Sequence, residues 1–164
     1  MEPIQIIVTG HPTAKGRARA FVRKDGKPGL VTPKATSWWE EDARLQARVA
    51  MKRQGNVPFT GCVEMVLIVY KAVPRSWPKW KKDAAWAGVI GPDGKPDLDN
   101  YLKAAKDALN GIVWLDDSQV VGGEQYKTYS ERPRVVISVW AAQKLPASTV
   151  TKEDLGRIES HEAG

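Results

Sequence analysis

Residues Pro96 to Val121 read PDLDNYLKAAKDALNGIVWLDDSQVV, and this stretch predicts a helix placed between two acidic pairs. Apolar residues recur along it at spacings of four, three, four and three, which puts them on one helical face. They are Leu98, Leu102, Ala105, Leu109 and Ile112. The dipeptide Asn110-Gly111 is a typical helix stop. We therefore expect an amphipathic helix that begins beside Asp97 and ends near Leu109.

Four aspartates flank this predicted helix. Asp97 and Asp99 stand at its start, and Asp116 and Asp117 follow the apolar run 112–115. Asp97 is placed to be the N-cap, because aspartate is a favoured cap and acidic side chains favour helix N-termini. A cap explains one aspartate but not all four. Carboxylates gathered in an otherwise basic chain indicate a metal site that faces a polyanion.

The two acidic pairs have two routes to one another. A twelve-residue helix is about 18 Å long, and five or six extended residues cover about the same distance. Residues 111–115 could therefore run back along the helix and return Asp116 and Asp117 to its start. Alternatively, the acidic pairs of two copies could meet across a dimer interface, and the sequence leaves both routes open.

Oxygen-rich clusters of this kind suit Mg²⁺, with Mn²⁺ as a possible substitute. Such ions activate water and stabilise the attacking and leaving oxygens in phosphodiester hydrolysis. Lys103 follows Asp99 by four residues, so it lies one turn away and could balance charge in the transition state. His11 and His161 are the only histidines and neither is near the cluster. Metal-assisted chemistry is therefore favoured over an imidazole general base.

Composition limits the alternatives. The chain has 164 residues, 42% of them hydrophobic and 27% charged, which suits one globular domain. No apolar run approaches the ~20 residues of a membrane span, and we expect neither a secretory signal nor a membrane partner. The single cysteine, Cys62, excludes an internal disulfide and a cysteine-based zinc site. These features predict a cytoplasmic location with no small-molecule cofactor.

The net charge of +6 favours nucleic acid as a partner. Two basic segments are candidate DNA contacts. In the first, Lys15, Arg17 and Arg19 alternate with small residues and would share one face of an extended segment. The alternative is a solvated loop. In the second, basic residues alternate with Trp77 and Trp80.

The second segment contributes Lys79, Lys81 and Lys82 to the predicted DNA contacts. Its tryptophans could stack on nucleic-acid bases or pack against the sheet. We favour packing against the sheet for Trp77, Trp80 and Trp86, with the lysines exposed.

Other segments predict the rest of the fold. Strands are expected at 4–9, at 63–73, where both faces may be covered, and at 135–140, with a hairpin turning at Asp25-Gly26-Lys27. A helix is expected from Thr36 or Ser37 to about Gln54. Its apolar surface would come mostly from Trp38, Ala43, Leu45, Val49 and Ala50.

The elements D-x-D-N-x-x-K, D-A-L-N-G and D-D-x-Q-V occur here in one order, in PDLDNYLKAAKDALNG and WLDDSQVV. Together they resemble the signature of the RusA family of Holliday junction resolvases, endonucleases of bacteria and their phages. The resemblance covers roughly residues 4–140. It implies an α+β fold class, with a small mixed β-sheet packed with two main helices, RusA-like and dimeric.

The resemblance also implies residue roles. Asp97, Asp99 and Asp117 match the metal-binding catalytic acids and Lys103 the required lysine, while Asp116 is matched with a less defined role. Residues 1–140 would form the endonuclease domain and 141–164 a polar C-terminal tail with no assigned role.

We expect an Mg²⁺-dependent homodimer that cuts four-way DNA junctions with paired symmetric nicks, in recombination and repair or in phage DNA processing. Its location would be the cytoplasm of a bacterial cell or phage-infected host. The alternatives are a noncatalytic DNA-binding factor and a nuclease with broader branched substrates such as flaps and forks.

Overall fold

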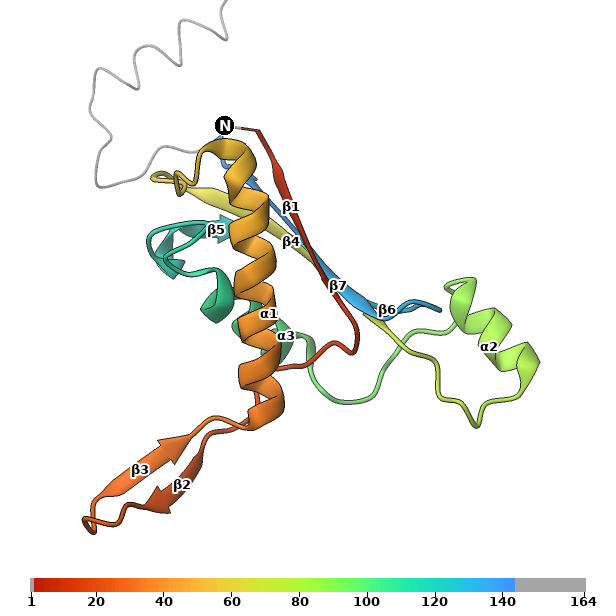
Figure 1. Ribbon diagram of the computed structural model, residues 1–164. Helices are drawn as coiled ribbons and strands as arrows, with labels where there is room; N and C mark the ends of the chain where they lie inside the picture. The colour runs from red at the N-terminus through yellow and green to blue at the C-terminus, as the bar shows by residue number, and fades with distance from the viewer. Residues whose placement is uncertain (1, 144–164) are drawn as a thin grey trace, which may run out of the picture.

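The computed structural model describes residues 2–143, which form a five-stranded mixed sheet with helices packed against it (Figure 1). The strand order is β1-β7-β4-β5, and β6 also pairs with β4. The strands of this sheet are β1 (Ile4–Thr9), β4 (Val63–Lys71), β5 (Val120–Gly122), β6 (Gln125–Tyr129) and β7 (Arg134–Ala141). β7 runs antiparallel to both β1 and β4, whereas β5 and β6 run parallel to β4. The expected α+β class with a mixed sheet is confirmed.

The strands β1, β4 and β7 bury one face of the sheet. In β4, Val63, Met65, Leu67 and Val69 alternate with half-buried residues, and β1 alternates between buried and exposed. This period of two is the pattern of a sheet with one covered face. The second face of β4 is half-buried, so the expectation that both faces of strand 63–73 are covered is met only in part.

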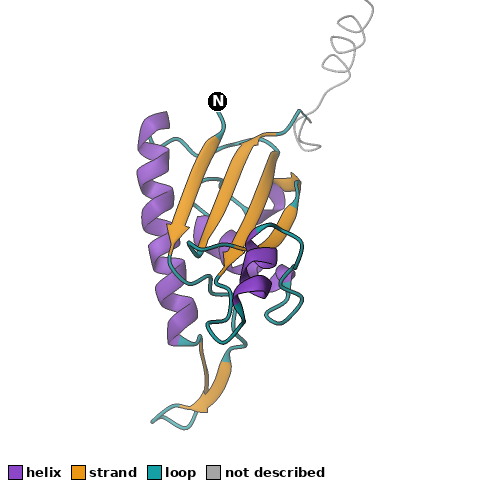
Figure 2. Cartoon of the chain, turned by 90° about the vertical axis from the view of Figure 1, so that its right-hand side faces the viewer, coloured by secondary structure: helices purple, strands orange, loops and turns teal. Residues whose placement is uncertain are grey.

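Helices α1 (Lys34–Met51) and α3 (Leu98–Leu109) pack against each other, and α1 also packs along β1. Figure 2 shows α1 beside the first strand and α3 behind the sheet. Alanines dominate the shared surface, since Ala43, Ala47, Ala104 and Ala108 are fully buried. Small side chains let the two helix backbones approach closely.

The predicted apolar face of α1 was wrong for Trp38, Leu45 and Val49, whereas Ala43 is buried and Ala50 packs at the margin of the core. The buried face carries Trp39, Glu40, Ala43, Ala47 and Met51, while Trp38 is 69% exposed and Leu45 and Val49 are also exposed. Two adjacent tryptophans point about 100° apart on a helix, so only one can face the core. A short 3-10 turn, Lys52–Gln54, ends the helix at Gly55.

The face of α3 is rotated from the predicted stripe. Tyr101, Ala104, Ala105, Ala108 and Leu109 are buried. Leu98, Leu102 and Ile112 are only partly buried and pack at the margin of the core. The helix itself begins and ends where the sequence predicts.

A predicted hairpin is confirmed between β2 (Arg19–Val22) and β3 (Pro28–Val31), and it extends away from the body of the molecule (Figures 1 and 2). Gly26, at φ +79°, makes its turn, and the amide of Lys27 donates to Asp25 Oδ1.

Helix α2 (Lys79–Trp86) follows β4 and buries only Ala85. The prediction that its tryptophans tuck onto the sheet was largely wrong, because Trp80 is 69% exposed and Trp86 is also exposed. Trp77 alone packs, with its ring edge-on to Tyr129 at a centroid distance of 5.5 Å. Trp80 and Trp86 are six residues apart, so they point about 120° away from each other around the helix axis and cannot share one face, and Trp77 lies before the helix.

No helix within residues 2–143 is both long and apolar enough to span a membrane. The prediction of a polar tail at 141–164 falls almost entirely outside the described residues.

Candidate active site

The start of α3 carries the first acidic pair. Asp97 is the N-cap residue, with extended dihedral angles, but its side chain makes no capping hydrogen bond. The position predicted from sequence is therefore confirmed, and the expected capping contact is not made. The exposed Asp97 carboxylate remains free to bind a cation.

Asp99 lies in the first turn of α3, and its carboxylate accepts a hydrogen bond of 2.9 Å from Lys103 Nζ. This hydrogen bond is the main reason why the pKa of Asp99 is lowered. A carboxylate with a lowered pKa is ionised at neutral pH, the state that a metal ligand requires. Asp97, Asp99 and Lys103 thus lie within two turns of one helix.

Two lysines that sequence reasoning missed fix the loop before Asp97. Lys127 of β6 donates to the carbonyls of Gly94 and Pro96, at 2.8 and 3.2 Å. Lys71 of β4 donates to the carbonyl of Lys95 at 3.3 Å. Burial, and then the charge of Lys127, lower the pKa of Lys71. No motif marks these lysines, because their partners are backbone atoms of a distant loop.

The second acidic pair lies in a compact turn after α3. Residues 111–113 form turns, and the amide of Gly111 donates to the carbonyl of Trp114. Of the two routes left open by the sequence, the extended return along the helix is therefore not the one that the chain takes. The glycine at φ +74° turns the chain at once, and Asp116 stays close enough to Lys106, in the last turn of α3, to feel its charge.

Each aspartate of this pair has a fixed partner. The indole of the buried Trp114 donates to Asp117 Oδ1 at 2.9 Å. Asp116 caps the 3-10 turn Asp117–Gln119 by accepting from the amide of Ser118. Hydrogen bonding to Ser118, first to its side chain and then to its amide, is the main cause of the lowered pKa of Asp116.

Gln119 holds this turn to the rest of the protein. Its Oε1 accepts from the amides of Leu115 and Asp116, and its Nε2 donates to the carbonyls of Phe59 and Gly61. Because one side chain makes all four bonds, the orientation of both aspartates depends on it.

The predicted site residues form two separate groups in the structure. One group is Asp97, Asp99 and Lys103, and the other is Asp116 and Asp117. Within residues 2–143, no group of three or more His, Cys, Asp or Glu side chains lies close enough to hold a metal ion. The donor set fits Mg²⁺ in its chemistry, since hard carboxylate oxygens are the ligands that this ion prefers. Each half of that set supplies only part of a coordination shell.

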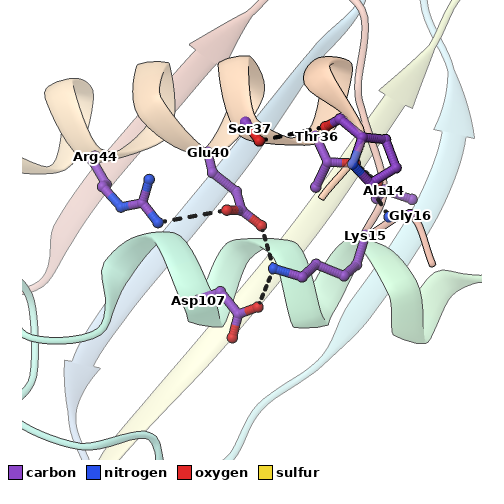
Figure 3. A network of polar contacts seen from close by, with 9 residues as sticks. Ala14, Lys15, Gly16, Thr36, Ser37, Glu40, Arg44 and Asp107 are labelled. Atoms are coloured by element: carbon purple, nitrogen blue, oxygen red, sulfur yellow. Dashed lines mark hydrogen bonds and ion pairs between the residues drawn. The ribbon is translucent and has the colours of Figure 1, made fainter. Parts of the chain in front are cut away.

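Lys15, a predicted DNA contact, forms an internal ion-pair network (Figure 3). Its Nζ lies 2.6 Å from both Glu40 Oε1 of α1 and Asp107 Oδ2 of α3, and Arg44 lies 3.5 Å from the other oxygen of Glu40. Burial lowers the pKa of Lys15, but the hydrogen bonds with Asp107 and Glu40 outweigh it and the net shift is upward.

The backbone around Lys15 is fixed as well. Its amide donates to the carbonyl of Asn100, one residue after Asp99. The amide of Gly16 donates to Thr36 Oγ1, which in turn donates to the carbonyl of Ala14 (Figure 3). The segment 14–16 therefore joins the start of α1 to the start of α3.

The other predicted DNA contacts are distributed over two separate elements. Arg17 and Arg19 are exposed at the base of the hairpin. On α2, Lys79 pairs with Asp83 at 2.8 Å, Lys81 lies 4.0 Å above the Trp77 ring, and Lys82 donates to the carbonyl of Arg75. Contact of these side chains with DNA stays a prediction.

An acidic helix start with a paired lysine, on a basic α+β domain, is a candidate active site for chemistry on a polyanion. The family model described as endodeoxyribonuclease RusA matches residues 9–140. The chain belongs to this family, whose members are Holliday junction endonucleases. It is also similar to "Uncharacterized protein YqaN" of Bacillus subtilis (strain 168), with 39% identity over 141 residues, covering 85% of this chain and 96% of that protein.

Proposed function

We propose that the protein is an Mg²⁺-dependent endonuclease that resolves four-way DNA junctions by paired nicks. The observation that carries the proposal is the free Asp97 carboxylate beside the Asp99–Lys103 pair, at the start of a helix whose sequence bears the family motif. The net charge of +6 suits a polyanionic substrate.

The protein's own groups have distinct roles in this reaction. Asp97 and Asp99 would hold the ion, which when bound acts as a Lewis acid and lowers the pKa of water. Lys103 is exposed, and within residues 2–143 its ammonium is bound only to Asp99, so it can move toward a non-bridging phosphate oxygen and stabilise developing charge. Asp117 is oriented by Trp114 and would complete the acidic set.

We further propose that two copies associate and that the acids of one complete the site of the other. Two features support this: the turn at 111–114 keeps the second pair near the end of α3, and α1 exposes Trp38, Leu45 and Val49 along one side. A two-fold dimer presents two sites to two symmetric strands of a junction.

The first test is cleavage of a labelled four-way junction in Mg²⁺, with linear duplex as the control substrate. Wild type should nick opposing strands symmetrically, whereas Asp97→Asn should bind without cutting. EDTA should stop cleavage, and Mg²⁺ or Mn²⁺ should restore it. Binding without cutting in either metal would instead favour a noncatalytic DNA-binding protein. Equal cutting of flaps and forks would favour a broader nuclease.

A mixing experiment tests completion across the dimer. Copies carrying Asp97→Asn are exchanged with copies carrying Asp117→Asn. If each site takes Asp97 from one copy and Asp117 from the other, a mixed dimer regains one intact site, and about a quarter of wild-type sites return. If each chain completes its own site, every site in the mixture keeps one defect and activity stays absent.

A further inference from the structure

The hairpin β2–β3 has no cover from the rest of residues 2–143. Its strands expose every residue except Gly29, and Figure 1 shows it pointing away from the sheet and from α1. We call residues 17–31 the arm. A two-stranded ribbon alone is marginally stable in water, so an exposed ribbon indicates a partner that covers it.

One face of the arm is entirely apolar. The strand register places Ala20 opposite Leu30 and Val22 opposite Pro28, and opposed residues share a face. Val22 is 75% exposed and Leu30 is 74% exposed. Contiguous exposed apolar side chains at the end of a projecting element are typical of a binding surface.

The other face is basic and aromatic. Arg19 lies opposite Val31, and Phe21 lies over Gly29, where an added Cβ would come within 2.7 Å of the Phe21 ring. Arg23 follows on the same face, bonded through its amide to the carbonyl of Lys27. Glycine at position 29 therefore lets the Phe21 ring lie flat against the ribbon.

The charge of the arm identifies its partner. Residues 17–31 carry five basic side chains, Arg17, Arg19, Arg23, Lys24 and Lys27, against the single acid Asp25. A second copy of this chain would bring the same positive charge to the contact, whereas DNA brings phosphate charge of the opposite sign. Charge complementarity therefore favours DNA over a protein copy.

We propose that the arm enters the branch point of junction DNA, where its apolar face covers unstacked bases while its arginines contact the flanking phosphates. This inference rests on the proposed function for its branched substrate. In a continuous duplex the bases stay stacked and the grooves offer mainly polar edges, so Val22 and Leu30 would find little cover there. At a branch point, base faces are accessible, and DNA-bending proteins insert apolar side chains to separate base steps. The arm thus determines specificity for branched over linear DNA.

The test places 2-aminopurine, a base whose fluorescence rises on unstacking, beside the branch point of a four-way junction. Binding is measured in EDTA, so that no cleavage occurs. Wild type should raise the fluorescence. The double variant Val22→Thr/Leu30→Thr keeps strand propensity, should abolish the rise and should weaken junction binding about tenfold, with duplex binding unchanged. Val89→Thr, at a residue 79% exposed after α2, is the matched control and should behave as wild type.

A second variant separates the two faces. Arg19→Gln/Arg23→Gln should weaken junction and duplex alike and reduce the slope of log affinity against log salt by about two. Far-UV circular dichroism and light scattering accompany each variant. If the threonine variant keeps both the fluorescence rise and the junction preference, the inference is overturned. If it loses only self-association, the apolar face is a protein interface and the inference is equally overturned.

The proposed function fails separately from the arm. If wild type unstacks the junction bases but never cuts the junction in Mg²⁺, the arm inference stands and the proposed nuclease function is refuted. A wild type that cuts junctions while the threonine variant cuts and binds them equally well removes only the arm inference.

Discussion

Replacing Lys15 by methionine is expected to lower the free energy of unfolding by about 1–3 kcal/mol. The Glu40 side chain is only 9% exposed, so it would keep a nearly buried charge with Arg44, at 3.5 Å, as its remaining partner. Breaking a buried pair costs about 3–5 kcal/mol, because the other charge stays uncompensated. The Asp107 side chain is 44% exposed, and an exposed pair contributes about 1 kcal/mol or less. The expected loss lies between these limits.

Urea unfolding followed by circular dichroism measures this loss. Lys34→Met, at an exposed lysine at the start of α1, is the control and should change stability by less than about 0.5 kcal/mol. Glu40→Gln should also destabilise. The double variant Lys15→Met/Glu40→Gln should lose less than the sum of the single changes, since contacting residues are not additive. Equal stability of Lys15→Met and wild type would refute the assigned role of the network.

The pH dependence of this loss has a definite sign. A group whose folded pKa is raised contributes stability below its ordinary value, 10.5 for Lys15, and loses that contribution as pH rises through the folded pKa. The difference between wild type and Lys15→Met should therefore be constant from about pH 6 to 9 and shrink only in more alkaline solution.

Three further changes have defined outcomes. Gln119→Leu removes all four hydrogen bonds that fix the second acidic turn, so it should lower the free energy of unfolding in urea by about 2–4 kcal/mol and abolish junction cleavage. The control Gln143→Leu, at an exposed residue, should change neither. Gly123 has φ +131°, and Gly123→Ala would place a Cβ 1.8 Å from a backbone carbonyl oxygen of β4, so it should lower the free energy of unfolding by more than about 3 kcal/mol. The control Gly91→Ala, whose Cβ would meet no atom within 4 Å, should leave thermal unfolding unchanged. Lys127→Met removes the hydrogen bonds that hold the loop before the first acidic pair, so single-turnover cleavage should slow about tenfold with little change in junction affinity. Lys127→Arg should keep much of the wild-type rate.

Local patterns in the sequence predicted the elements well. The spacing of Leu98, Leu102 and Leu109 located α3, and the dipeptide Asp25-Gly26 located the arm's turn, because both depend on neighbouring residues alone. Which face each helix buries was harder to predict. The spacing of apolar residues does not distinguish Trp38 from Trp39. Trp39 is buried because its side of the helix faces the rest of the core.

The site was predictable in its residues but not in its arrangement. Asp97, Asp99 and Lys103 are close in sequence, so helix geometry alone places them together. The turn after α3 depends on Trp114 entering the core and on Gln119 reaching Phe59 and Gly61, contacts across sixty and fifty-eight residues respectively. Lys71 and Lys127 are hidden for a related reason, because their acceptors are backbone carbonyls 24 to 33 residues away, which no side-chain pattern reveals.

The pairing of β1 with β7 constrains how this chain can fold during synthesis. Ile4 lies opposite Val139, so the first strand to leave the ribosome cannot pair until β7, the last strand of the described residues, has been made. β4 needs the same partner strand for its residues 63–70. Until β7 emerges, two apolar strands have unpaired edges, and closing so long a loop is slow. A chain that stops before residue 134 would therefore keep the four aspartates of the candidate site, Asp97, Asp99, Asp116 and Asp117, and still lack the central strand of its sheet. Such truncations are expected to aggregate rather than to be merely inactive.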